Sequence, residues 1–303
     1  MKTKVYTAAL AYALITGLSF LFGKIGLISV NPLDLLAYRF TAAFLAVLFL
    51  LLFRLVKVNY SSTRVMRSIP LALLYPLAFF SLQTFGLQYA SSSEAGIMTA
   101  SIPVFTLILA TLFLKEKTTS IQKLSILASV AGVVYLTLAK SSALEFNNSL
   151  GMILLLASAL AFSGYSILAR ILTRDFSSIE LSTMMFTTSF VFFSALAVCR
   201  HLLDGSVTDF LQPLASMQFL GSVLYLGVLS TLITSLLTNY ILSKIEASKM
   251  SVFSNLGTVI SILAGAVFLN EQLFYYHIVG SILIVGGVLG ANLRGGSART
   301  ANS

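Results

Sequence analysis

Long apolar stretches recur through this chain, and each is long enough, at roughly 20 residues, to cross the hydrocarbon core of a membrane as an α-helix. Strands of a membrane barrel are excluded, because the stretches do not alternate apolar with polar residues and are about twice as long as such strands. The sequence therefore predicts an all-α integral membrane protein with ten transmembrane helices, at residues 5–28, 34–55, 68–90, 94–114, 121–139, 149–171, 179–203, 216–239, 246–269 and 274–293.

The composition indicates that lipid is the main solvent of the chain. Hydrophobic residues make up 57% and charged residues 10%, with a mean hydropathy of +0.95. Polar side chains are therefore too few to cover a soluble globule. A net charge of +9 is also typical of nucleic-acid-binding proteins, but here the basic residues stand in short connections between apolar stretches. We expect membrane lipid, and no nucleic acid, as their partner.

The distribution of Lys and Arg over the connections predicts an orientation. If the N-terminus is cytoplasmic, fifteen basic residues lie on the inner side, and only Lys24, Lys140 and Arg200 lie on the outer side. Such a bias is the positive-inside rule. It predicts a multi-pass protein of the cytoplasmic membrane with both termini in the cytoplasm.

Two parts of the chain share a spacing. Phe113-Leu114-Lys115-Glu116 aligns with Phe268-Leu269-Asn270-Glu271, and Gly-Val follows each Glu after sixteen residues. Because each half would hold five helices, the second half enters the membrane from the opposite side. We therefore expect two inverted repeats, at residues 1–140 and 149–293, followed by a cytoplasmic tail at 294–303. Glu116 and Glu271 are expected to have structural roles in equivalent turns.

Small and polar residues three or four positions apart share one face of several predicted helices. Matching faces in two inverted halves favour an aqueous substrate cavity between them. The alternative is that these residues only pack helices and hydrogen-bond between them. The candidate cavity residues are Tyr12, Thr16, Ser19, Tyr75, Gln83, Gly96, Ala100, Ser163, Ser166, Thr231, Ser235, Thr238, Ser251, Asn255 and Thr258.

Two cations, Lys24 and Arg39, lie inside predicted spans near their outer ends. One hypothesis is that they attract a carboxylate or another anionic group at the outer mouth of the cavity. The alternative is that both side chains extend to the lipid headgroups, or pair with Asp34 and Glu94 on the same side.

Reactive motifs of known enzyme classes are not found in the sequence. All ten acidic residues fall in connections or at helix ends, and neither a zinc-binding His-Glu-x-x-His nor a nucleophile motif is present. We therefore expect no enzyme activity, no cofactor and no metal. A membrane-embedded enzyme or a receptor is the rival from another class. Small residues four apart in the last helix of each half, Ala128 with Gly132 and Gly286 with Gly290, could pack another helix or form a homodimer.

With these residues in view, the chain resembles the EamA family of the drug/metabolite transporter superfamily. The likeness rests on residues 89–116 and 225–271, and on Pro32 and Arg39 in NPLDLLAYRF. The resemblance implies ten helices in inverted repeats around a central pocket, with alternating access. The proline of the family pattern is kept at Pro103, but Thr258 takes its place in the second copy.

Together these features predict a secondary transporter that exports amino acids or related small polar metabolites. A multidrug exporter and a metabolite importer remain as alternatives, because alternating access has no direction that a sequence reveals.

Overall fold

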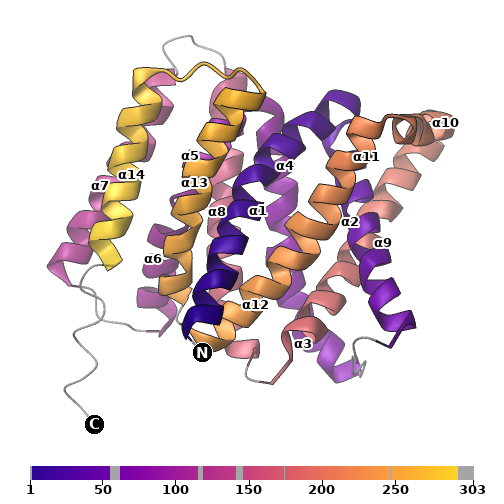
Figure 1. Cartoon of the computed structure of the whole chain (residues 1–303), viewed down its shortest axis with the longest axis horizontal. Helices are drawn as coiled ribbons and strands as arrows, with labels where there is room; N and C mark the ends of the chain where they lie inside the picture. Colours follow the sequence, from indigo (N-terminus) through magenta and orange to yellow (C-terminus); the bar gives the residue numbers. More distant parts are fainter. Residues whose placement is uncertain are drawn as a thin grey trace.

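The computed structural model describes residues 2–54, 62–114, 119–140, 146–173, 175–245 and 247–292, and these residues are almost entirely helical (Figure 1). The first half contains α1 (Lys2–Ser29), α2 (Pro32–Leu52), α3 (Ser62–Ala72), η1 (Leu73–Ala78), α4 (Phe79–Tyr89), α5 (Ser92–Thr99), α6 (Ile102–Leu114) and α7 (Ser120–Lys140). The second contains α8 (Phe146–Leu172), α9 (Ser178–Asp204), α10 (Val207–Leu211), η2 (Gln212–Ala215), α11 (Met217–Leu224), η3 (Tyr225–Ile233), α12 (Thr234–Lys244), α13 (Ala247–Phe268) and α14 (Tyr275–Asn292).

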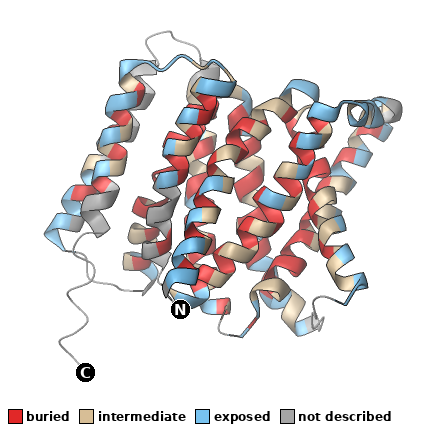
Figure 2. Cartoon of the chain, in the orientation of Figure 1, coloured by how far each residue is buried: buried red, intermediate tan, exposed pale blue. Residues whose placement is uncertain are grey.

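The prediction of a helical membrane protein is confirmed. Within the described residues, seven helical segments have the length and apolar composition to cross a membrane: Thr3–Ser29, Pro32–Leu52, Thr63–Tyr89, Ser92–Phe113, Ser149–Leu172, Ser178–Asp204 and Met217–Lys244. Shorter apolar stretches lie in α7, α13 and α14. A helix suits this composition because it satisfies its own backbone polar groups, for which hydrocarbon offers no partner. Figure 2 shows buried residues gathered between the helices and exposed ones on their outer faces.

Two of the long helical segments are interrupted by π-helical turns, which the sequence does not predict. The segment 62–89 contains η1, in which Tyr75 has non-helical angles (φ −145°, ψ 119°). Pro76 has no backbone N–H to donate, so the regular pattern of helical hydrogen bonds is interrupted there. The segment 217–244 contains η3, nine residues long, without a proline. There the carbonyl oxygen of Leu226 accepts a hydrogen bond from Thr231 Oγ1 at 2.7 Å. In a regular helix a backbone N–H would occupy this carbonyl.

A further interruption separates α5 from α6 at Ala100 and Ser101, just before Pro103. Pro103 accounts for this interruption, since a proline removes one hydrogen bond of the preceding turn. The corresponding α13 runs without a break from Ala247 to Phe268.

Helices of the two halves pack against each other rather than as two separate bundles. The main pairs are α7 with α14, α1 with α13, α4 with α8, α2 with α9 and α5 with α13. Close approach of α1 and α13 requires Gly17, where an added Cβ would lie 2.6 Å from the carbonyl oxygen of Gly257. The start of α1 and the end of α14 lie on the same, lower side in Figure 1.

Gly132 supplies the close packing between α7 and α14. A Cβ on it would lie 2.8 Å from the Cβ of Leu283, whereas Gly286 has no atom within 4 Å of such a position. The first small-residue face is thus used within the chain, and a homodimer remains a prediction.

Glu271, in the connection between α13 and α14, joins the two halves at the upper side of Figure 1. Its carboxylate accepts hydrogen bonds from the backbone N–H groups of Ser92 and Ser93 at 2.6 and 2.9 Å, and from the Ser93 hydroxyl at 2.6 Å. A carboxylate is stabilised there because the first N–H groups of a helix have no partner within it. Its proposed counterpart, Glu116, lies outside the described residues.

Two histidine–carboxylate contacts join the halves at the same side. His201 Nε2 lies 3.1 Å from Asp34 Oδ2, and His277 Nε2 lies 3.6 Å from Glu94 Oε1. Asp34 and Glu94 each stand in the first turn of their helix, α2 and α5. In the described part of the chain, Arg39 is hydrogen-bonded to Ser230 and Thr231 and to neither acid, contrary to the pairing considered for it.

Candidate functional site

A small cavity lies between the two halves, with a volume of about 20 Å³. That volume holds about one water molecule. The first half supplies residues of α1, α4, α5 and α6, and the second half supplies one residue each from α8 and α13. Its lining consists of Tyr12, Thr16, Phe20, Phe79, Gln83, Thr99, Ile102, Phe162 and Gly257. The space inside this lining is much smaller than a metabolite.

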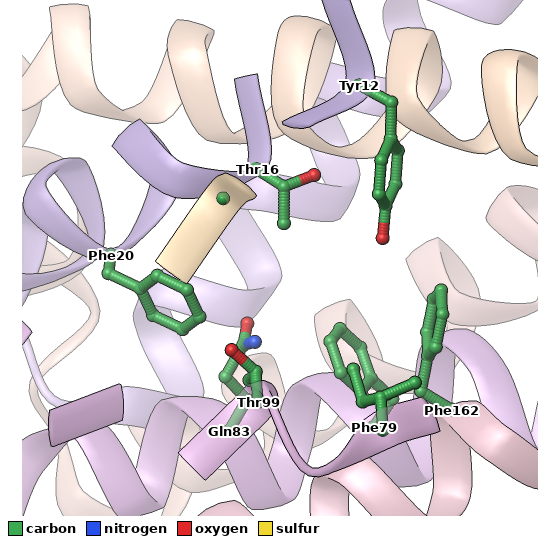
Figure 3. Close-up of a pocket in the computed structure, with 9 residues that line it drawn as sticks. Tyr12, Thr16, Phe20, Phe79, Gln83, Thr99 and Phe162 are labelled. Atoms are coloured by element: carbon green, nitrogen blue, oxygen red, sulfur yellow. The ribbon is translucent and has the colours of Figure 1, made fainter. Parts of the chain in front are cut away.

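The polar groups of the cavity come from different helices (Figure 3). The Tyr12 hydroxyl points into the space from α1, and the Gln83 amide lies beside the Thr99 hydroxyl on the opposite wall. Thr99 Oγ1 donates to the carbonyl of Gly96 at 2.8 Å. Gln83 is 6% exposed, and its side chain makes no hydrogen bond within the described part of the chain. A buried amide with unused donors and acceptors is costly unless a ligand or water supplies them.

Aromatic rings form the wall that continues from this cavity into η1. Tyr75 lies with its ring centroid 4.5 Å from that of Tyr165, and contacts the rings of Phe79, Phe80 and Phe162. Such a wall is rigid and apolar, and it leaves recognition of polar groups to the few side chains named above.

Arg39 stands on the other face of this wall. Its guanidinium carbon is 3.8 Å from the ring centroid of Phe80. Nε donates to Thr231 Oγ1 at 2.7 Å, and Nη2 donates to the hydroxyl and carbonyl oxygens of Ser230 at 3.0 and 3.3 Å. The side chain therefore turns inward to η3 and does not reach the lipid headgroups. Lys24 is half-buried near the end of α1.

A comparison with family models identifies the family of this chain. The model of the EamA-like transporter family matches residues 3–138 and again residues 149–293. The chain belongs to the EamA-like transporter family. The expected membership is thus confirmed, and the family model recognises two copies of its unit in this chain.

Relatives of this EamA-family chain are described as transporters. The uncharacterized transporter YcxC of Bacillus subtilis is 46% identical over 292 residues, which is 96% of this chain and 94% of that protein. An uncharacterized transporter of Archaeoglobus fulgidus is 29% identical over 204 residues, 67% of this chain and 68% of that protein. A crystal structure with 21% identity has a TM-score of 0.68 and covers 96% of this chain and 97% of its own, which supports the fold alone.

The structure brings some of the predicted site residues of this EamA-family protein together at the cavity and leaves others in helix contacts. Tyr12, Thr16 and Gln83 line the cavity. Ser163 and Thr258 instead donate to carbonyl oxygens of neighbouring helices, at Ile102 (3.0 Å) and Gly96 (2.9 Å). Gly96 packs closely on Ser261 of α13, Ala100 is buried at the α5–α6 break, and Ser19 and Ser166 donate to carbonyls of their own helices.

Three predicted residues lie in the segment 217–244. Thr231 binds Arg39, as described, and Thr238 is buried at 2% exposure. Ser235 lies 2.9 Å from the hydroxyl of Ser182, which accepts a hydrogen bond from Asn239. Ser251 and Asn255 lie in α13, but their side chains, like Glu116, are outside the described residues.

Other cavity residues were not identified from the sequence: Phe20, Phe79, Thr99, Ile102, Phe162 and Gly257. Four of them are large and apolar, so in a membrane protein they carry no signal that separates a cavity wall from a lipid-facing surface. Thr99 is three residues from Gly96, on the same face of α5 as the predicted stripe, and this spacing could have identified it.

Proposed function

We propose that this protein is a secondary transporter of the cytoplasmic membrane that exports a small polar metabolite, an amino acid or a similar compound. In this proposal ten helices form two inverted repeats of five, and both termini are cytoplasmic. The observation that carries it is the small cavity, which is lined from both halves and contains the amide of Gln83, a group without a hydrogen-bond partner in the described part of the chain.

The inverted arrangement is supported by matched positions in α2 and α9. Ser177 caps α9 as Asn31 caps α2, 146 positions earlier. The same offset relates Phe44 to Phe190, whose rings stack on each other at 4.4 Å with an angle of 2°. Equivalent residues contact each other when they lie beside a two-fold axis, as inverted repeats require.

The packing of the other helices supports the same symmetry. The contact of α1 with α13 has its counterpart in α8 with α6, and α4 with α8 has its counterpart in α1 with α12. The π-helical segments also correspond, because η3 begins 152 residues after η1 and ends 155 residues after it. Under this symmetry α7, α13 and α14 complete the count of ten.

The proposed mechanism is alternating access. A cavity of about 20 Å³ has no room for an amino acid, so substrate entry requires the helices to move apart. The π-helical segments are places where a helix can bend, since their hydrogen bonds already depart from the regular ladder. On the upper side of Figure 1, the contacts of Glu271 with Ser92 and Ser93 would have to break in an outward-open state.

The experiment is a flux measurement in proteoliposomes that contain the purified full-length protein. We expect saturable counterflow of at least one labelled amino acid and slower flux of a cationic dye. Absence of saturable flux for every metabolite in a broad panel would contradict the proposal. Saturable dye flux without amino acid flux would favour a multidrug exporter, and both outcomes overturn the substrate class named here.

A further inference from the structure

We propose that Arg39 binds the carboxylate of the transported substrate. The inference rests on the transport function proposed above and adds to it that the substrate carries an anionic group. In the described part of the chain, Arg39 is a buried cation hydrogen-bonded to neutral groups, and the matching position in the other half holds no cation.

The charge of Arg39 has no acidic partner in the structure as described. The residue is 4% exposed, and each ion pair found among the described residues joins an acid to another cation. A buried ion without a counter-ion is expensive, and in transmembrane helices such cations mark binding sites for substrate. Arg39 therefore carries a cost that an anionic ligand would offset.

The guanidinium also has unused donors. Its hydrogen bonds come from Nε and Nη2, whereas Nη1 donates none within the described part of the chain. A carboxylate accepts two parallel hydrogen bonds from an arginine, and such charged bonds are roughly twice as strong as neutral ones. The present acceptors on Ser230 and Thr231 are neutral, so a carboxylate would compete with them successfully.

The fold does not require a cation at this crossing. With the offset of 146 that relates the two caps, the residue equivalent to Arg39 is Met185 of α9. Met185 is fully buried in the main apolar cluster of the protein. One half thus packs a methionine where the other keeps a charge, which indicates that the charge serves binding rather than packing.

Helix α4 connects Arg39 to the cavity. Phe80 of this helix lies under the guanidinium, while Phe79 and Gln83, one and three residues away, line the cavity. Because Phe80 and Gln83 are three residues apart in α4, the cation and the amide lie beside adjoining faces of the same helix. A movement of α4 would expose both to one substrate, with its carboxylate on Arg39 and a neutral polar group on Gln83.

The test uses purified full-length protein in detergent, with propionate and propionamide as probes of similar size and different charge. The thermal unfolding midpoint is followed while chloride is replaced by propionate at constant ionic strength. We expect the midpoint of the wild type to rise, because a ligand bound to the folded state stabilises it. Propionamide at the same concentration should have no effect. In Arg39→Gln and Arg39→Met the dissociation constant for propionate should increase at least about tenfold.

Arg200→Gln is the matched control, since Arg200 is a half-exposed cation that pairs with Asp34 at the upper side of the fold. It should keep the propionate response. The inference is overturned if propionate has no effect on the wild type, if propionamide has an equal effect, or if the Arg39 variants respond as the wild type does. It is also overturned if Arg39→Met, which copies the other half, unfolds much more readily than the wild type in the absence of propionate, because the guanidinium is then structural.

The two proposals fail in different ways. If amino acids are transported but the propionate response does not depend on Arg39, the transport function stands and Arg39 is not the binding residue. If the propionate response depends on Arg39 but no metabolite is transported, Arg39 is an anion-binding residue and the proposed transport function is wrong.

Discussion

The crossing of α2 with η3 and the crossing of α9 with η1 occupy equivalent places in the two halves and differ in chemistry. At the first, Arg39 binds the oxygens of Ser230 and Thr231 in a π-helical segment of nine residues. At the second, Met185 of α9 is buried in the main apolar cluster, and the π-helical segment η1 that packs on α9 has six residues. Under the proposed inverted repeat, the two crossings are equivalent and only one of them carries a charge.

The difference between the two crossings suggests how a duplicated fold becomes specific. The three additional residues of η3 lie in the segment that presents the Ser230 carbonyl and hydroxyl to the guanidinium. Unwound segments are where transporters place charged groups, because free backbone oxygens are available there. In the proposed mechanism, the repeated helices are the parts that move, and the charge found in one repeat alone binds the substrate.

The largest expected effect on stability comes from placing a cation at the matching position of the second half. Met185→Arg places a cation in an apolar cluster, at a crossing with η1 rather than with the hydroxyls of η3. A buried ion without partners should destabilise the protein by about 3–5 kcal/mol. The measurement is the thermal midpoint in detergent, with Met185→Leu as control, expected to cost less than about 1.5 kcal/mol. If Met185→Arg folds as well as Met185→Leu, the two crossings do not differ as described.

A smaller loss of stability is expected when one hydrogen-bond acceptor of Arg39 is removed. Thr231→Val keeps the side-chain shape but removes the acceptor of Arg39 Nε and the donor to Leu226. Leaving a charged donor unpaired should cost about 1.5–3 kcal/mol. Thr183→Val in α9 is the control, because the Thr183 hydroxyl has no hydrogen-bond partner among the described residues. Equal losses in both variants would show that Thr231 does not hold the guanidinium.

The smallest effect concerns the approach of the two backbones at the charged crossing. A Cβ on Gly227 would lie 2.6 Å from the carbonyl oxygen of Arg39. Gly227→Ala should therefore push η3 away from α2 and cost about 1–3 kcal/mol. Gly221→Ala meets no atom within 4 Å and should be neutral or stabilising by up to about 1 kcal/mol. Similar midpoints for the two variants would contradict the close packing at this crossing.

Features that depend on short stretches of sequence could be predicted. The apolar spans, the family and the interruption before Pro103 each follow from the composition or pattern of one segment. Tyr12, Thr16 and Gln83, chosen for their polarity, line the cavity. Helical spacing and the cost of polar groups in lipid carry this much information.

Features that depend on distant partners could not be predicted. Arg39 meets Ser230 and Thr231 about 190 positions later in the chain, and nothing near Arg39 in the sequence indicates that contact. The nine residues of η3 read as a regular apolar helix, because π-helical turns come from tertiary contacts and not from propensity. Ser163 and Thr258 resemble cavity residues in the sequence, yet they bond to carbonyls of adjacent helices.

The most direct test that Arg39 binds the substrate carboxylate is competition against the flux of a labelled amino acid in proteoliposomes. The unlabelled amino acid and its amide are compared as competitors in the wild type and in Arg39→Met. If Arg39 binds the carboxylate, the acid should inhibit wild-type flux at least about tenfold more strongly than the amide, and the two compounds should inhibit the variant equally. An acid-to-amide ratio that is unchanged in Arg39→Met would contradict it.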